Sequence, residues 1–247
     1  QPPLRIDPDL LRQRSFISPD GERTAITEGL RRIKQRILAD MRVRAAGPRN
    51  LIMITSALPG EGKTFCAINL AISLAMELEH SVLLVDADNV RPNVLESLGL
   101  EPKLPGLMDV LGDRTLSLSD VVRSTSIEKL SVLPAGSPHR NSTELLASDA
   151  MRRLVADLTG RFGDRIVIFD SPPLLVASES AALASHMSQI LLVAAAKQTT
   201  VAALGDALSR LEGCQGKVAL VLNKGDDTGA GYGYYGYGYG DGLGRRG

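Results

Sequence analysis

The sequence predicts an α/β fold in which a mostly parallel β-sheet is covered by helices on both faces. Six apolar runs indicate strands, and they occupy residues 51–54, 81–88, 130–136, 165–173, 189–196 and 217–224. Helical spacing of apolar residues lies between them, most clearly in residues 63–79, 143–161 and 199–212. Near-continuous apolar strands that alternate with helices are typical of a parallel sheet buried on both sides. A ligand crevice is therefore expected at the carboxyl ends of the strands.

Length and charge place few demands on the fold. A chain of 247 residues can bury roughly 70–75% of its unfolded surface, so one core without metals or disulfides is enough. The formal net charge is zero, which gives no indication of a nucleic-acid partner. Cys66 and Cys214 have no metal-binding or redox spacing, which suits a reducing, cytoplasmic compartment. The longest apolar run, about eight residues, is too short to span a bilayer, so no transmembrane segment is expected.

Three sections differ in composition. Residues 1–24 are polar, with three prolines before residue 9, and we expect an extended N-terminal arm. Residues 25–224 form the predicted domain, which begins with a basic helix over residues 25–44. That helix is interpreted either as a solvated face or as a surface for a neighbouring subunit or an anionic membrane. Residues 225–247 are rich in Gly and Tyr and are expected to be disordered when free.

The stretch LIMITSALPGEGKT, residues 51–64, fits a phosphate-binding loop between a strand and a helix. In such loops backbone N–H groups surround the β-phosphate, a lysine reaches the β- and γ-phosphates, and a hydroxyl binds Mg²⁺. Lys63 and Thr64 stand at these two positions, although Ala57 replaces the first glycine of the pattern. A glycine-rich turn without a ligand is the alternative. The predicted ATP-binding residues of this loop are Pro59, Gly60, Glu61, Gly62, Lys63, Thr64 and Phe65.

Acidic residues follow two of the predicted strands. Asp86 and Asp88 end the run at 81–88, and Asp170 ends the apolar part of the run at 165–173. A carboxylate at such a strand end is how P-loop proteins hold Mg²⁺, directly or through water. We predict Asp170 in the water shell of the metal, Asp86 at the metal or behind it, and Asp88 as the base that orients an incoming hydroxyl. The alternative for Asp88 is the N-cap of the helix after Arg91.

Other polar residues have weaker indications. Asn223 and Lys224 end the last strand where a nucleotide base would be bound, and Asn223 is the remaining predicted ATP-binding residue. Arg91 is expected either to face phosphate or to form a surface ion pair. The three histidines have no metal-ligand spacing.

With these motifs in place, the chain resembles the bacterial protein-tyrosine kinases, P-loop autokinases that control export of surface polysaccharide. It looks most like their exosortase-associated branch. The likeness covers residues 25–224: SALPGEGKT matches the phosphate loop, VLLVDAD the second acidic motif (Walker A′), and IVIFDSPP the Walker B motif. In the related MinD/ParA-like ATPases of cell division and partitioning, a second lysine precedes the glycines. Leu58 stands at that position here, which counts against membership of those ATPases.

The resemblance implies a P-loop NTPase of the MinD/ParA-like class that uses ATP and Mg²⁺. It implies Thr64, Asp86 and Asp170 at the metal, and Lys63, Asp86 and Asp88 as catalytic residues. It also implies a separate membrane activator, the chain-length-determinant protein, which would hold the kinase at the inner membrane.

A subunit-contact motif of the family, Glu-x-x-Arg-x-x-Arg, resembles EGLRRIK in the basic helix. Glu28 and Arg31 match, whereas Lys34 replaces the second arginine and cannot reproduce its bidentate fork. The resemblance implies a homo-oligomer such as a ring. Val90 is a second departure, because many members carry Arg there.

The tail holds every tyrosine of the chain, at positions Tyr232, Tyr234, Tyr235, Tyr237 and Tyr239. Glycine spacing makes such a segment flexible enough to enter an active site. The family phosphorylates a tyrosine cluster between subunits, so these five are the predicted autophosphorylation sites. An adhesive or solvating tail is the alternative.

The sequence therefore predicts a tyrosine kinase that phosphorylates its own tail in trans and regulates polysaccharide export. Two other functions remain open at this stage. One is an ATPase switch whose tail docks partners, and the other is a nucleotide-binding adaptor of a membrane polysaccharide transporter. Phosphotyrosine formed with MgATP, compared with release of free phosphate, separates them.

Overall fold

The computed structural model describes the chain except for residues 1, 22–23, 43–48, 161–164 and 226–247. In the described part, seven strands form one sheet in the order β3-β4-β2-β5-β1-β6-β7. All neighbours pair in parallel except β3 and β4, which are antiparallel. The strands are β1 (Leu51–Ser56), β2 (Ser81–Asp86), β3 (Arg123–Ser124), β4 (Leu130–Leu133), β5 (Arg165–Asp170), β6 (Gln189–Ala195) and β7 (Lys217–Asn223).

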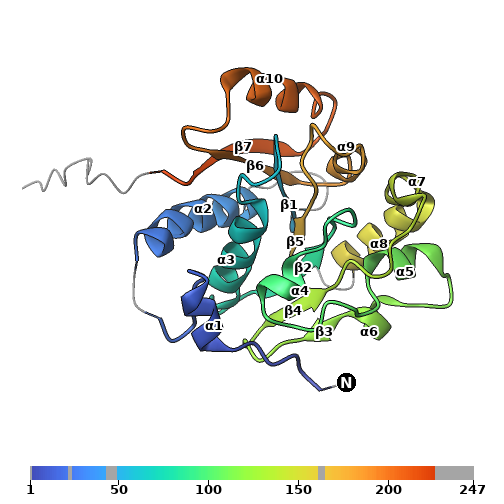
Figure 1. The fold of residues 1–247 in the computed structure, drawn as a ribbon. Helices are drawn as coiled ribbons and strands as arrows, with labels where there is room; N and C mark the ends of the chain where they lie inside the picture. The colour runs from blue at the N-terminus through green and yellow to red at the C-terminus, as the bar shows by residue number, and fades with distance from the viewer. Residues whose placement is uncertain (1, 22–23, 43–48, 161–164, 226–247) are drawn as a thin grey trace, which may run out of the picture.

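Helices cover both faces of this sheet (Figure 1). On one face the core is built with α1 (Pro8–Gln13), α2 (Ala25–Arg42), α3 (Lys63–Ala75) and α4 (Val94–Ser97). The other face packs against α5 (Leu107–Gly112), α6 (Leu118–Val121), α7 (Ser142–Leu146), α8 (Asp149–Gly160), α9 (Glu179–Ala184) and α10 (Val201–Ser209). The predicted fold class and all six predicted strands are confirmed. No helix of the described residues is long and apolar enough to cross a membrane.

The helical run expected over residues 143–161 is two helices. Ser148 separates them, because its hydroxyl accepts hydrogen bonds from Ala150 N and Met151 N and so caps the start of α8. The short strand β3 and the short helices α4, α5 and α6 were not predicted from apolar spacing, since none of them is longer than six residues.

The extended arm predicted for residues 1–24 is wrong. Residues 8–13 form α1, in which Asp7 caps the helix by accepting from Asp9 N at 2.9 Å and Pro8 starts it. Proline at the first turn favours a helix, because its fixed φ is already helical. Ile6, Leu11 and Ile17 are buried in the core, so this segment is part of the domain.

Candidate active site

The phosphate loop is held between a fully buried strand and a helix. All of β1 is buried, and α3 begins at Lys63, directly after the loop. Gly60 and Gly62 have φ values of 80° and 95°, a backbone conformation that side chains rarely adopt. A Cβ atom on Gly62 would also lie 2.0 Å from Asn223 Nδ2. Glycine at position 62 is therefore required both by the backbone and by the close approach of β7.

A buried carboxylate inside the loop braces it. Glu61 is almost fully buried, and its Oε2 accepts from Leu58 N at 2.8 Å. Its Oε1 accepts from the hydroxyl of Thr199, which in turn accepts from Ala195 N at 2.8 Å. The side chain of Glu61 ties the loop to the turn after β6, and the predicted role of Glu61 in ATP binding stays a prediction. Sequence reasoning missed Thr199, because its contact with Glu61 depends on the turn after β6.

The end of β7 supports the other side of the loop. Asn223 Nδ2 donates to Glu61 O at 2.9 Å, and Lys224 Nζ donates to Gly60 O at 2.8 Å. Both residues were expected near a nucleotide base, and they do lie beside the loop. Base recognition by Asn223 stays a prediction.

A charged cluster of Lys63, Asp86, Asp88 and Asp170 lies beside the phosphate loop, and Lys63 is at its centre. Its Nζ is 2.7 Å from Asp88 Oδ2, 3.8 Å from Asp170 Oδ1 and 3.4 Å from Thr64 Oγ1. Burial alone would lower the pKa of this ammonium, but the nearby carboxylates, Asp170 first, outweigh burial and raise it. Lys63 therefore stays charged at neutral pH.

Asp86 is bound to the backbone that follows it. Its Oδ2 accepts from Asn93 N at 3.1 Å and Val94 N at 3.0 Å, and its Oδ1 accepts from Asp88 N at 3.3 Å. Asp86 thus caps the first turn of α4, a role that the sequence reasoning had considered for Asp88. Burial, together with the carboxylate of Asp170, raises the pKa of Asp86 to about 7, against the lowering effect of the amide hydrogen bonds.

Asp170 is opposite Asp86 in the sheet register and has a different environment. Both of its oxygens are buried, and within the described residues no hydrogen bond of ordinary geometry reaches either of them. Burial raises the pKa of Asp170 to about 6, opposed by the charge of Lys63 and the nearby Thr64 hydroxyl. A buried carboxylate without an ordinary hydrogen bond is costly, and a metal cation in contact with it would lower that cost further than Lys63 does from 3.8 Å.

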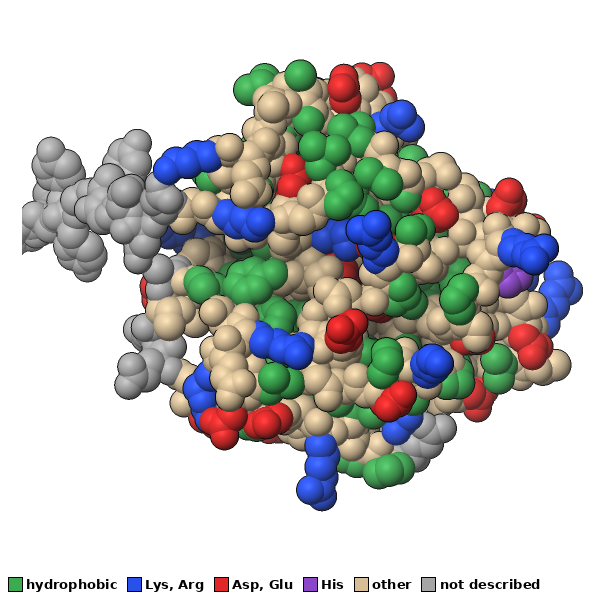
Figure 2. All heavy atoms as spheres, viewed as in Figure 1, with side chains coloured by type: hydrophobic (Ala, Val, Ile, Leu, Met, Phe, Trp, Pro, Cys, Tyr) green, Lys and Arg blue, Asp and Glu red, His purple; other side chains and the backbone are tan. Residues whose placement is uncertain are grey.

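Asp88 and Arg91 lie where the cluster opens to solvent. Asp88 Oδ1 accepts from Arg91 N at 3.0 Å, while its Oδ2 accepts from Lys63. The two residues line a cavity of about 630 Å³ that also contains the exposed parts of the phosphate loop. Figure 2 views this face of the molecule, where hydrophobic and charged side chains meet around a hollow.

Phe16 is a wall residue of this cavity that the sequence reasoning missed. Its ring stacks on Phe65, with ring centroids 5.5 Å apart, and Ile17 N donates to the buried Asn69 Oδ1 at 2.7 Å. The N-terminal segment thereby reaches the first turn of α3. Phe65 was predicted as an ATP-binding residue. Nothing in the spacing of residues 1–24 indicated that Phe16 would stack on it.

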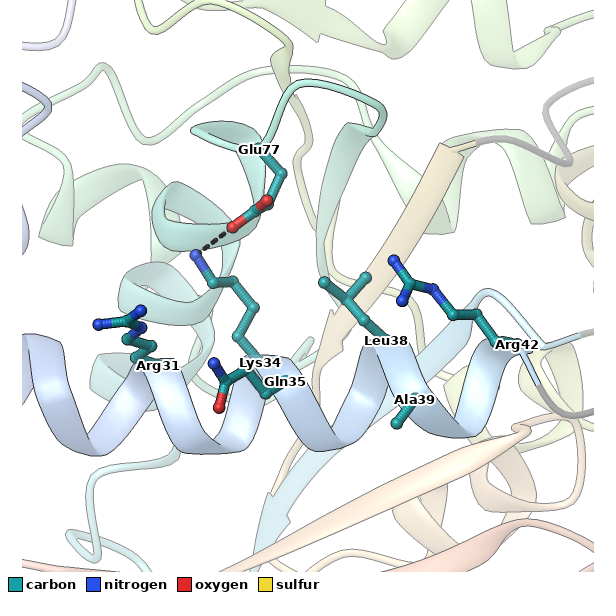
Figure 3. Close-up of a pocket in the computed structure, with 7 residues that line it drawn as sticks. All are labelled: Arg31, Lys34, Gln35, Leu38, Ala39, Arg42 and Glu77. Carbon is teal, nitrogen blue, oxygen red and sulfur yellow. Dashed lines mark ion pairs between the residues drawn. The ribbon is translucent and has the colours of Figure 1, made fainter. Parts of the chain in front are cut away.

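The predicted subunit-contact residues Glu28, Arg31 and Lys34 all belong to α2, and Figure 3 shows Arg31 and Lys34. Glu28 and Arg31 are half exposed and 3.9 Å apart. Lys34 is mostly buried, lies 2.5 Å from Glu77 Oε1 and also donates to Ser73 O at 3.3 Å. Lys34 therefore joins α2 to the end of α3 within one chain, and its role between subunits stays a prediction. The five tail tyrosines lie outside the described residues.

Comparisons with known proteins show the family of this chain. A family model described as an AAA domain matches residues 49–220. The tyrosine-protein kinase YwqD of Bacillus subtilis is 34% identical over 167 residues, which is 68% of each chain. The chain belongs to the bacterial tyrosine-protein kinase family. Among the kinases of this family, some curated relatives are much longer, and the chain spans about a fifth of their length.

Solved structures of the kinase family show the same architecture. The kinase domain of the Escherichia coli tyrosine kinase ETK is 26% identical, with a TM-score of 0.69 over 94% of both chains. The septum site-determining protein MinD of Pyrococcus horikoshii, solved with Mg-ADP, has a TM-score of 0.55 at 23% identity and covers 69% of this chain and 68% of that one. The second likeness concerns the fold alone, and it confirms the predicted MinD/ParA-like class.

Proposed function

We propose that this chain transfers the γ-phosphoryl group of ATP to tyrosine, chiefly to the cluster in its own tail. Membership of the tyrosine-kinase family and the charged phosphate loop support this proposal. The observation that carries it is Asp170, a buried carboxylate that no hydrogen bond of ordinary geometry reaches within the described residues and that lies 3.8 Å from the lysine of the phosphate loop. Such a group in a nucleotide site favours chemistry with a metal-bound triphosphate.

The residues present fit ATP with Mg²⁺. Mg²⁺ prefers oxygen ligands and keeps several waters, so Thr64 and Asp170 suffice on the protein side. Asp86 was predicted at the metal as well. Its carboxylate accepts hydrogen bonds from three backbone amides, and its role at the metal stays a prediction. Bound Mg²⁺ would neutralise charge on the β- and γ-phosphates.

The reaction requires two functions from the chain. The loop amides and Lys63 stabilise the negative charge that spreads over the transferred group. Asp88 accepts the proton of the tyrosine hydroxyl. As it does so, the tyrosine oxygen bonds to the γ-phosphorus and the bond between the γ-phosphorus and the leaving oxygen of ADP breaks. Because Asp88 Oδ2 is paired with Lys63, movement of Lys63 toward phosphate frees that oxygen for the proton.

The tail is the proposed acceptor, and transfer between subunits is its proposed route. Each phosphate adds about −1.5 to −2 charge at neutral pH, so phosphorylated tails in a ring would repel each other and loosen it. Glu28 and Arg31 on α2 are the proposed contacts of that ring. A membrane chain-length-determinant protein is the proposed activator, and regulation of polysaccharide export is the proposed outcome.

Incubation of the full chain with MgATP and the cytoplasmic part of its activator tests this function. Mass spectrometry of the tail counts phosphates, and an assay of free phosphate runs in parallel. We expect phosphate on the tail tyrosines, lost when all five are replaced by Phe. Steady release of free phosphate without phosphotyrosine would instead identify an ATPase switch. Binding of ATP with neither product formed would identify a nucleotide-binding adaptor.

A further inference from the structure

The edge strand β7 has an apolar face that nothing in the described structure covers. β7 pairs with β6 on one side only and ends the sheet (Figure 1). Val218, Leu220 and Leu222 are 36%, 58% and 69% exposed. The alternate residues Ala219 and Val221 pack toward the core on the opposite face. An exposed apolar edge strand is a ready template for another strand, and proteins normally protect such edges with charge or cover.

The register explains why this face is open. Val218 is paired with Ile190 and Leu220 with Leu192, so each pair lies on the same face of the sheet. Ile190 and Leu192 are fully buried by the helical layer of that face. The covering layer therefore ends between β6 and β7. No charged residue lies between Lys217 and Lys224, so the strand itself carries no protection against pairing.

The tail has the pattern that matches this face. Tyr235, Tyr237 and Tyr239 alternate with glycine, as do the three exposed residues of β7 with their inward neighbours. Alternate residues of a strand lie on one face, so three tyrosines can share a face as the three aliphatic residues do. No residue from 231 to 240 is charged. Aromatic side chains opposite aliphatic ones are favourable cross-strand pairs.

The tail also starts in the right place. Residue 225 follows the end of β7 after Lys224, and twelve residues separate Leu222 from Tyr235. That length exceeds what an antiparallel return needs, since hairpin loops of two to five residues are common. In an antiparallel return, Tyr235, Tyr237 and Tyr239 would lie opposite Leu222, Leu220 and Val218 in one constant register.

We propose that residues 235–239 of the same chain dock antiparallel along β7 and cover Val218, Leu220 and Leu222. The docked segment holds Tyr235, Tyr237 and Tyr239 against the sheet. At Tyr234 and Tyr235 two tyrosines are adjacent, so the alternation with glycine shifts by one residue. Tyr232 and Tyr234 come before this shift and stay outside the contact. Phosphate on any of the three docked tyrosines would place charge on an apolar face and release the segment.

The regulatory part of this inference rests on the proposed function. If the tail is the acceptor, docking makes Tyr232 and Tyr234 the first residues to be phosphorylated, and the other three follow only when the segment is released. Docking itself needs neither nucleotide nor activator, so the two ideas can fail independently.

Intrinsic fluorescence tests docking directly in the full chain. The protein has no tryptophan and all five tyrosines are in the tail, so tyrosine emission reports the tail alone. We compare fluorescence anisotropy and acrylamide quenching in the parent protein and in Leu220→Lys, without nucleotide. Because a leucine loses its apolar contact and a charge enters, the docking equilibrium should fall by about tenfold or more. Anisotropy should drop and quenching should rise.

Matched variants separate docking from general effects. Leu78→Lys adds the same charge at a leucine that is 89% exposed and remote from β7, and it should leave the emission unchanged. Leu220→Ile should keep the parent signal. Leu222→Lys repeats the test at a more exposed position if Leu220→Lys has a lower melting temperature than Leu78→Lys.

Two results would overturn the proposal. Equal anisotropy and quenching in Leu220→Lys, Leu222→Lys and the parent protein would show that the tail does not touch β7. A parent signal that disappears on dilution would show that the occupant is a second copy. Phosphotyrosine absent from every variant, with docking intact, would reject the proposed kinase function and leave the docked tail in place.

Discussion

Asp86 and Asp170 end neighbouring strands opposite each other, and both are buried, yet their surroundings differ. Asp86 accepts three backbone hydrogen bonds and fixes the first turn of α4. Asp170 accepts none of ordinary geometry within the described residues and lies near Lys63. One carboxylate is held by the backbone that follows its own strand, and the other lacks such bonds, which is why we propose it for the metal-bound nucleotide. A strand-end aspartate is therefore not a single kind of residue, even in one sheet.

The largest effect is expected from Lys63→Met, which removes the cation shared by Asp88 and Asp170. Loss of one preorganised charge at the transferred group should lower tail phosphorylation by roughly 10²–10³-fold or more. The fold should persist, because β1 and α3 keep their buried contacts. Phosphopeptide counting measures the first effect and circular dichroism the second. Phosphorylation that survives in Lys63→Met would remove the loop from the mechanism.

The paired variants Asp86→Ala and Asp170→Ala sharpen the comparison. Asp86→Ala leaves the amides of Asp88, Asn93 and Val94 without their acceptor and should cost roughly 2–4 kcal/mol of unfolding free energy. Asp170→Ala removes a buried carboxylate that no hydrogen bond of ordinary geometry reaches within the described residues, so stability should stay within about 1 kcal/mol of the parent or rise. Urea unfolding without nucleotide measures both. Equal losses in the two variants would contradict the different roles.

The pH dependence follows from the same pair. Burial raises both pKa values above the unfolded value of 3.8, to about 7 for Asp86 and about 6 for Asp170. The folded state then binds more protons than the unfolded state between these limits, so stability without nucleotide should fall as pH rises from about 4 to 7. Asp170→Asn should make the decrease of unfolding free energy with pH less steep, because one of the two titrating carboxyls is removed. A parent slope of opposite sign in urea unfolding at several pH values would contradict the shifts.

A smaller effect than that of Asp86→Ala is expected where Thr199 braces the phosphate loop. Thr199→Val removes the hydroxyl that donates to buried Glu61 and accepts from Ala195 N. The cost should be about 1–2 kcal/mol of unfolding free energy, with a raised KM for ATP because the loop loses its fixed position. Thr199→Ser should restore both. An unchanged KM alongside lowered stability would show that the brace serves the fold alone.

The sequence predicted the elements of this site because each prediction depended on short-range patterns. Neighbouring residues alone reveal a continuous apolar strand, a Gly-x-Gly-Lys-Thr turn and a carboxylate at a strand end. Parallel pairing of the strands then brings Lys63, Asp86 and Asp170 to the same edge of the sheet. The roles of Asp86 and Glu61 were not visible, because their partners depend on the path of loops after β2 and β6. Phe16 was missed for the same reason.

Binding of a non-hydrolysable ATP analogue with and without Mg²⁺ is the most direct test of the claim that Asp170 is reserved for the metal-nucleotide complex. Calorimetry compares the parent protein with Asp170→Asn, and Leu78→Lys is the control. We predict that Mg²⁺ strengthens binding to the parent and to the control, and that Asp170→Asn loses most of this gain while nucleotide binding without metal persists. An equal gain in Asp170→Asn would contradict the account.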